Sequence, residues 1–264
     1  MTAELRVAVI GCGAIGETVA RFLASGQLAG ARLVGVVHAE EFDPPGLPVC
    51  SVTEAIDRAD LVVECAGQQA LIEFGPQVLA AGVDLLVVST GALTDDAVLE
   101  ALRSARGGRV YLSTGAIGGI ELLRAAALAG PFDSVRIVTT KRATTLIQPW
   151  MSERAADELR AAEHPVELKR GSAREVAQAF PKSANVAASV ALAVGSWDCV
   201  EAVVIADPAA TLTSHVITAR GPAGDYRFEI RNQPSAQTPA TSALVPFAVL
   251  RAIADRVGAR ETFL

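Results

Sequence analysis

LRVAVIGCGAIG, residues 5–16, is the stretch of sequence that decides the fold. Its first half is the apolar, β-branched run that is typical of a strand buried on both faces. After the glycines, residues 14–24 carry apolar side chains at helical spacing. A strand, a Gly-x-Gly-x-x-Gly turn and a helix, in that order, are the context in which this motif binds a dinucleotide.

Each glycine of the motif has its own physical task. Gly11 permits a tight turn, Gly13 lets the backbone approach a pyrophosphate, and Gly16 lets helix and strand pack closely. The free N–H groups and the positive end of the helix then favour the diphosphate charge. We therefore expect a dinucleotide on Gly11, Gly13, Ala14, Ile15 and Gly16. The alternative is a glycine-rich turn that binds nothing.

Composition narrows the class of protein. The chain has 264 residues, of which 51% are hydrophobic and only 5% aromatic, so its core is built from small aliphatic side chains. Such a core favours an α/β protein with parallel strands over a β-sandwich. The net charge of -6 argues against nucleic acid or an anionic membrane as the partner. An anionic small substrate must then be attracted by locally placed cations.

Cysteine usage and hydropathy indicate the compartment. Cys12, Cys50, Cys65 and Cys199 show no metal-ligand spacing, so we expect no metal site and packing roles in a reducing compartment. No apolar run reaches the roughly 18 residues that a membrane span needs. The first strand begins too early to leave room for a signal peptide. These features predict a cytoplasmic protein with no membrane partner.

Strands and helices continue to alternate through the first half of the chain. This alternation predicts a doubly wound, Rossmann-type parallel sheet. A capping box at residues 51–54 begins a short helix. Further strands are expected at residues 32–37, 60–65, 83–88 and 109–112, and further helices at 69–81 and 94–105.

Small residues follow these strands, at the edge where ligands lie in such sheets. We expect Ala66 and Gly67, the turn at residues 89–91, and Gly115 with Ala116 to line one crevice. The alternative is that the glycines only make tight turns.

The second strand decides how the ribose is bound. An acidic residue usually ends this strand and accepts from the ribose hydroxyls. Here the position is His38, followed closely by Glu40 and Glu41. Either glutamate could serve through the loop, or His38 could lie beside a 2′-phosphate. The sequence therefore leaves NAD and NADP open.

The pattern changes after residue 118. Alternating runs with helices to one side predict a second, smaller α+β domain with an open mixed or antiparallel sheet. We expect residues 1–118 to bind the dinucleotide, 119–238 to form the substrate and catalytic domain, and 239–264 to pack back on the first. Strands are expected at 134–140, 199–206, 212–221 and 226–232, helices at 120–128, 172–179, 186–194 and 241–257, and a loop at 141–152.

Three histidines are candidates for moving a proton. His164 lies in a polar loop and His38 in the adenosine region, whereas His215 lies in the middle of a second-domain strand. An imidazole there suits acid–base work near neutral pH. The alternative is a histidine that is simply hydrogen-bonded on a sheet face.

The segment at residues 180–185 is the other candidate. Asn185 could cap a helix or hydrogen-bond a carboxamide such as that of nicotinamide. Four cations are placed to receive a carboxylate, although a solvated surface explains any one of them: Lys182, Lys141, Arg142 and Arg174.

Together, these motifs resemble the L-aspartate dehydrogenase family over nearly the whole chain. The motifs are GCGAIG at 11–16, STGAIGG at 113–119, FPKSANVAA at 180–188, IADP at 205–208, His215, and TSAL at 241–244. The most specific is the motif at 180–188 followed thirty residues later by His215. The chain differs from the family pattern at His38, at residues 141–144 (KRAT, where Arg-Lys-Pro-Pro is usual), and at Thr213, where asparagine is usual.

The resemblance implies NAD(P)-dependent oxidation of L-aspartate to iminoaspartate, which yields oxaloacetate and ammonia, and the reverse reductive amination. It implies His215 as the catalytic residue, cofactor contacts by Ala116 and Asn185, a homodimer, and a link to pyridine nucleotide biosynthesis. We expect the site in a cleft between the domains, with His38, Ala66 and Gly67 also on the cofactor and Lys182 and Ser183 on the substrate. The alternatives are a same-fold dehydrogenase acting on another amino or hydroxy acid, and a non-enzymatic dinucleotide-binding regulator.

Overall fold

The computed structural model describes residues 4–38, 44–181, 183 and 185–258. Within it the chain forms two compact units, one made of Met1–Gly115 with Val245–Leu264 and the other of Ala116–Leu244. Three residues named above, Glu40, Glu41 and Lys182, lie outside the described residues.

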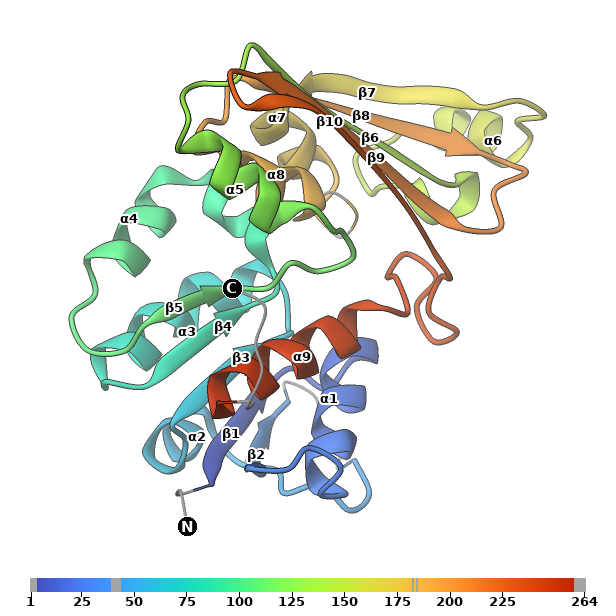
Figure 1. Cartoon of the computed structure of the whole chain (residues 1–264). Coiled ribbons are helices and arrows are strands. Elements are labelled where there is room, and N and C mark those ends of the chain that lie inside the picture. Colours follow the sequence, from blue (N-terminus) through green and yellow to red (C-terminus); the bar gives the residue numbers. More distant parts are fainter. Residues whose placement is uncertain (1–3, 39–43, 182, 184, 259–264) are drawn as a thin grey trace. The chain divides into compact units, whose positions relative to one another are not determined.

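The first unit contains a parallel sheet with strand order β2-β1-β3-β4-β5 (Figure 1). The chain moves outward from β1 to β2 and then returns to β3, so the strand order reverses between β1 and β3. The predicted doubly wound sheet is confirmed. Its strands are β1 (Leu5–Ile10), β2 (Ala31–Val37), β3 (Leu61–Glu64), β4 (Asp84–Val87) and β5 (Val110–Leu112). Its helices are α1 (Ala14–Ala24), α2 (Val52–Arg58), α3 (Gln68–Ala80), α4 (Asp96–Ser104) and α9 (Val245–Val257), with a 3-10 turn η1 (Thr90–Thr94).

Burial explains why the sequence forms this sheet. Val7 to Ile10 of β1 and all four residues of β3 are buried, as expected for central parallel strands covered on both faces. The last helix, α9, packs against α1 and β2 of this unit. Arg256 on α9 holds it in place, because its guanidinium pairs with Asp84 at 2.6 Å and lies 5.7 Å from the Tyr111 ring centroid.

The second unit contains a mixed sheet with strand order β10-β9-β6-β8-β7. The β6–β8 pair is parallel and the other pairs are antiparallel, which confirms the predicted α+β architecture. Helices α5, α7 and α8 lie on one side of this sheet (Figure 1). The strands are β6 (Ser134–Arg142), β7 (Val166–Ser172), β8 (Val200–Asp207), β9 (Thr213–Gly221) and β10 (Gly224–Asn232). The helices are α5 (Ile120–Ala127), α6 (Glu153–Arg160), α7 (Ala173–Ala179) and α8 (Asn185–Val194), with a 3-10 turn η2 (Ala143–Leu146).

The structure corrects two expectations for this half of the chain. The loop predicted from residue 141 is wrong at its start, because β6 continues to Arg142 through its pairing with β8. The last helix begins at Val245 instead of residue 241, because residues 234 and 242 form a bridge before it. Helix α6 and strand β7 were not predicted, because their many charged residues hide their periodicity.

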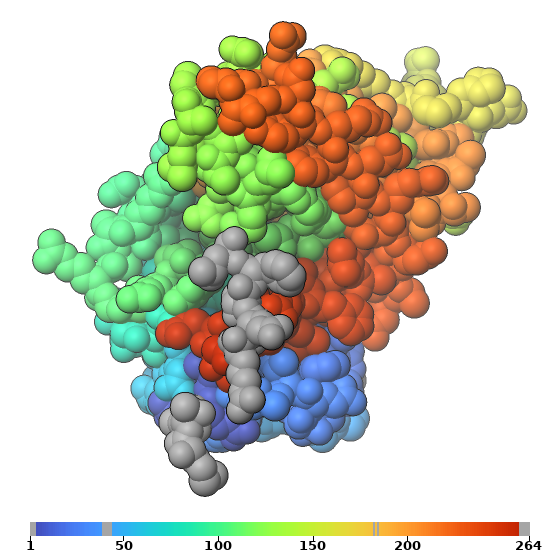
Figure 2. All heavy atoms as spheres, in the orientation of Figure 1, coloured from blue at the N-terminus to red at the C-terminus, as the bar shows by residue number. Residues whose placement is uncertain are grey.

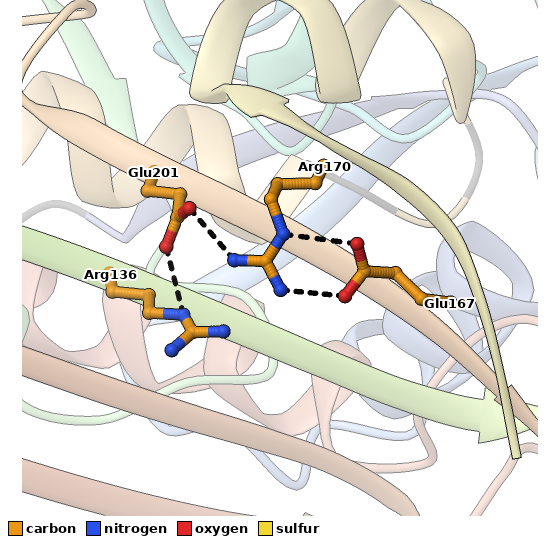
Figure 3. A network of polar contacts seen from close by, with 4 residues as sticks. All are labelled: Arg136, Glu167, Arg170 and Glu201. Atoms are coloured by element: carbon orange, nitrogen blue, oxygen red, sulfur yellow. Dashed lines mark hydrogen bonds and ion pairs between the residues drawn. The ribbon is translucent and has the colours of Figure 1, made fainter.

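The outer face of the second sheet carries a network of ion pairs across three strands (Figure 3). Glu201 of β8 accepts from Arg136 of β6 at 2.9 Å and from Arg170 of β7 at 2.8 Å. Arg170 also pairs with Glu167 at 2.6 Å. These side chains are exposed, so solvent screens each pair and its contribution to stability is small. Because its members come from β6, β8 and β7, the network helps to keep these three strands in register, although it adds little to the stability of the fold.

The edge strand β10 lies on the surface, in the orange atoms of the space-filling view (Figure 2). Its residues alternate between half-buried and exposed, and the exposed ones are charged: Asp225, Arg227, Glu229 and Arg231. Charged side chains on an edge strand discourage pairing with a further strand of another molecule.

Candidate functional site

The glycines after β1 have the geometry that the dinucleotide motif requires. Gly11 has φ +97°, and a Cβ there would lie 2.6 Å from the Ala66 Cα. A Cβ on Gly16 would overlap the carbonyl oxygen of Gly11. By contrast, a Cβ on Gly13 would meet nothing within 4 Å. Two glycines are thus required by the protein's own backbone, and the third leaves a space that a pyrophosphate can approach.

The first turn of α1 presents backbone N–H groups at this space. Gly13 is the N-cap residue and has an extended backbone, and no described side chain caps the helix. Orphan N–H groups and the helix dipole together favour an anion. Ala14, Ile15 and Gly16 belong to this turn. The cradle therefore has the shape and the donors that the diphosphate of a dinucleotide requires.

Glu64, which the sequence analysis missed, ties together the carboxyl ends of β3 and β4. Its side chain is 1% exposed. One carboxylate oxygen accepts from the Gly67 amide at 2.8 Å and the Ser89 hydroxyl at 2.9 Å, and the other accepts from the Ser89 amide at 3.0 Å. Burial raises the pKa of this carboxyl, while the N–H donors oppose the rise. The only signal in the sequence is a carboxylate inside an apolar strand.

We expect Glu64→Gln to lower the free energy of unfolding by about 1 to 3 kcal/mol. Both oxygens accept from a backbone N–H, so either orientation of the glutamine amide places an NH₂ group against a donor. Urea unfolding measures the loss. Glu73→Gln, an exposed change on α3, is the matched control and should stay within about 0.5 kcal/mol of wild type. Equal stability of the two variants would contradict this role for Glu64.

His38 directly follows β2 and is half-buried. The preceding carbonyl, that of Val37, accepts from the Gly11 amide at 2.8 Å. The structure thus joins the residue before His38 to the first glycine of the cradle by a hydrogen bond.

His215 is buried on the helix-covered face of the second sheet. It lies on β9, opposite Thr139 of β6, and is 2% exposed. Its Nδ1 and the Thr139 hydroxyl are 3.0 Å apart. Burial, and secondarily the charge of Lys141, lower the pKa of His215 to about 3. The imidazole is therefore neutral near pH 7, with one nitrogen held by Thr139.

Lys141 lies on the same face of the sheet, two residues beyond Thr139. It is 4% exposed, and its Nζ donates to the Ala240 carbonyl at 2.6 Å. Burial lowers the pKa of this ammonium to about 8. In the sequence, the alternation of Val135, Ile137 and Thr139 already points to residue 141 as the next inward position.

The turn that precedes α8 contains a buried polar atom without a partner. The Ser183 hydroxyl is the one buried side-chain oxygen or nitrogen of the described residues that has no hydrogen bond. Trp150 supports this turn, because its Nε1 donates to the Ala179 carbonyl at 2.8 Å and its ring packs edge-on against Phe180. An unpartnered buried hydroxyl needs an explanation, and a ligand is one. Asn185 is the first residue of α8.

Ala116 lies in a turn that β10 holds in place. Its carbonyl accepts from the Asn232 side chain at 2.7 Å. Gly119, with φ +82°, begins α5, and a Cβ there would strike the Phe228 ring. Both contacts come from β10, so the turn has a defined position within the second unit.

The other candidates lie in different surroundings. Arg142 donates to the Ala210 carbonyl at 3.3 Å, and Arg174 lies over the Trp197 ring at 5.1 Å. His164 is exposed.

The described part of the chain holds no group of three or more His, Cys, Asp or Glu side chains that could bind a metal ion. It also has no helix of the length and hydropathy that crossing a membrane requires.

Comparisons with known proteins cover both units. The family described as "Aspartate dehydrogenase, C-terminal" matches residues 121–256, and that described as "Homoserine dehydrogenase, NAD binding domain" matches residues 11–112. The L-aspartate dehydrogenase of Ruegeria pomeroyi is 39% identical over 260 residues, which cover 96% of this chain and 93% of that protein. That of Ralstonia pickettii is 38% identical over 266 residues, 97% of this chain and 98% of that protein. The crystal structure of aspartate dehydrogenase from Thermotoga maritima superposes with a TM-score of 0.78 at 25% identity, over 99% of this chain and 100% of that one.

Proposed function

This chain belongs to the L-aspartate dehydrogenase family, and from this premise we propose the reaction of the protein and the roles of its residues. It is an NAD(P)-dependent oxidoreductase that converts L-aspartate to iminoaspartate, from which hydrolysis gives oxaloacetate and ammonia, and it runs the reverse reductive amination. The observation that carries this conclusion is the identity of 39% to a named L-aspartate dehydrogenase over 96% of the chain.

The first unit binds the dinucleotide in this proposal. The glycine cradle and the first turn of α1 hold the pyrophosphate, and His38, Ala66 and Gly67 contact the cofactor at the ends of β2 and β3. When bound, the nicotinamide supplies the acceptor for the hydride that leaves the substrate Cα. The open space at Gly13 and the uncapped helix start support this assignment. NAD and NADP both stay candidates, because His38 stands where an acidic residue is usual.

His215 is the acid–base residue of the second unit in this proposal. Its imidazole is neutral, so it can accept a proton. When Nδ1–H donates to Thr139, the lone pair lies on Nε2, which can then take a proton from the water that attacks the imine carbon. In reductive amination the same nitrogen returns the proton. Because the Thr139 hydroxyl contacts Nδ1, Nε2 is the ring nitrogen left for the chemistry.

The substrate residues come from the turn before α8. We assign Ser183 and Lys182 to the substrate, and Asn185, with Ala116, to the cofactor. The unpartnered Ser183 hydroxyl supports a ligand at this turn. Within the second unit, both Ala116 and the turn are anchored by side chains from other elements, Asn232 and Trp150. Such anchoring is what a binding residue needs if it is to keep its geometry.

We propose that the protein is a cytoplasmic homodimer and that its product, iminoaspartate, supplies pyridine nucleotide biosynthesis. The sheet face opposite α7 and α8 supports self-association, because half-buried Val138, Ile205 and Val216 lie there beside the Arg–Glu network. A face that mixes apolar side chains with both charge signs can pair with a second copy of itself. Light scattering of the purified protein gives the mass, and a monomer at micromolar concentration contradicts the dimer.

A cofactor-by-substrate assay tests the proposed function. The absorbance of reduced nicotinamide is followed with L-aspartate and each of NAD and NADP, and in reverse with oxaloacetate and ammonium. We expect turnover in both directions. Turnover of L-homoserine or L-malate but not L-aspartate identifies instead a same-fold dehydrogenase. Dinucleotide binding without turnover of any acid identifies a regulator.

A further inference from the structure

We propose that Lys141 is the residue that receives a carboxylate of the substrate and so makes the site selective for dicarboxylic acids. This inference rests on the proposed function, since it assigns a group to the same site. Two observations carry it: the place of Lys141 on the same face of the sheet as His215, and its burial without a countercharge.

The strand register puts Lys141 on the face that carries His215. On β6, Val135, Ile137, Thr139 and Lys141 alternate inward, and Thr139 lies directly opposite His215. Two residues of strand span about 7 Å. The Lys141 backbone is therefore about one substrate length along the sheet from the pair that holds the imidazole. This separation matches the length of a four-carbon dicarboxylate.

Lys141 is a buried cation without a charged partner. None of the ion pairs among the described residues includes it, and its hydrogen bond goes to a neutral backbone carbonyl. An ammonium has further N–H donors to satisfy. Burial of an uncompensated charge is costly, so such a group is expected to be paired in the working state of a protein. The substrate of this family brings the missing countercharge, because aspartate carries two carboxylates.

Two further basic residues of the described strands share the inner face with Lys141: His215 of β9 and, two strands away from β6, Lys169 of β7, which lies opposite Val204. The Lys141 charge lowers the pKa of the His215 imidazole. On the neighbouring strand β8, Glu201 and Asp207 pair in register with Arg136 and Arg142 and so lie on the other face. A carboxylate that pairs with Lys141 would offset its charge and raise the pKa of His215 from about 3. Substrate binding would thus improve His215 as a base.

Two other roles for Lys141 predict different behaviour. As a general base, Lys141 would take a proton from the substrate ammonium, and its loss would lower kcat with little effect on affinity. As a structural anchor, it would only hold the chain at Ala240, and its loss would lower stability without changing ligand selectivity.

The test measures binding of succinate, a dicarboxylate that cannot be oxidised at an amine, to the NAD(P)-loaded protein by calorimetry. The proteins are wild type, Lys141→Met, Lys141→Arg, and Lys169→Met as the matched control on β7. We expect the dissociation constant to rise about tenfold to a hundredfold in Lys141→Met, less in Lys141→Arg, and not at all in Lys169→Met. Propionate, which has one carboxylate, should bind weakly to wild type, and its dissociation constant should rise less than that of succinate in Lys141→Met.

The pH dependence separates a carboxylate receptor from an anchor. Succinate binding by wild type should weaken as pH rises through about 8, because Lys141 loses its proton there. Contact with the carboxylate raises the pKa of Lys141, so at saturating succinate the weakening of binding should occur at a higher pH. In Lys141→Arg, succinate binding should not weaken as the pH rises through about 8, because arginine stays protonated. The pH profiles of wild type and Lys141→Arg therefore test the proposal even if Lys141→Met does not fold.

Several results would overturn the proposal. Either of two binding results contradicts a carboxylate contact: wild type binds no succinate, or folded Lys141→Met binds it with an unchanged dissociation constant. So does a pH dependence of binding that persists in Lys141→Arg, or a Lys141→Met variant in which only kcat falls. Failure of the proposed function has a different signature. It appears as wild-type protein that binds succinate in a Lys141-dependent manner but does not oxidise L-aspartate.

Discussion

Replacing His215 by alanine is expected to lower kcat for L-aspartate by about two to four orders of magnitude while NAD(P) binding persists. The reason is that the imidazole is the neutral, buried base of the second unit, with Thr139 holding its Nδ1. Alanine removes the proton acceptor and leaves the glycine cradle of the first unit untouched. The rate of nicotinamide reduction at saturating aspartate measures the loss, and fluorescence titration with the reduced cofactor measures the binding.

A second substitution separates chemistry from packing at this position. His215→Gln retains a polar side chain that can hydrogen-bond Thr139 but cannot accept a proton, so it should fold better than the alanine variant and be almost as slow. His164→Ala, an exposed change, should leave kcat unaltered. Wild-type turnover in either His215 variant removes this histidine from the mechanism.

The second large effect is expected from Gly13→Val, which should weaken cofactor binding by at least about a hundredfold. A side chain on Gly13 enters open space and meets no protein atom within 4 Å, so it occupies the volume through which a pyrophosphate approaches. At Gly11 or Gly16 the same change would instead strike the protein's own backbone. Gly13 is therefore the position at which binding can be blocked with the least damage to the fold.

The matched control is Ala24→Val, which adds a valine at the exposed far end of the same helix. Both variants should melt close to wild type, and only Gly13→Val should lose the cofactor in calorimetry. Retention of normal affinity by Gly13→Val would show that the dinucleotide does not lie on this turn.

Much of the fold could be predicted from the sequence because its signals are local. The glycine spacing and the buried runs of β1, β3 and β4 are each contained within a few residues. The capping boxes at Ser51 and Ser172 also marked the starts of α2 and α7. By contrast, α6 and β7 have charged sequences, and β7 is held by its antiparallel pairing with β8.

The polar partners at the candidate site could not be predicted because they depend on long-range register. Thr139 and His215 are far apart in the sequence, and only the β6–β9 pairing brings them together. Glu64 likewise reaches from the end of β3 to Ser89, just beyond the end of the neighbouring strand β4. The burial of Lys141 depends on the continuation of β6 beyond the predicted strand end. The local sequence signals, a carboxylate within an apolar strand and the alternation that leads to residue 141, do not identify the partners in these contacts.

The assignment of α9 to the first unit has a consequence for biosynthesis. This unit is assembled from two separated pieces of chain, and its last piece is made only after the whole second unit. Domains generally fold as units while the ribosome elongates the chain. The second unit can thus fold on the ribosome while the first unit still lacks the helix that packs against α1 and β2, so the first unit completes its fold after the second.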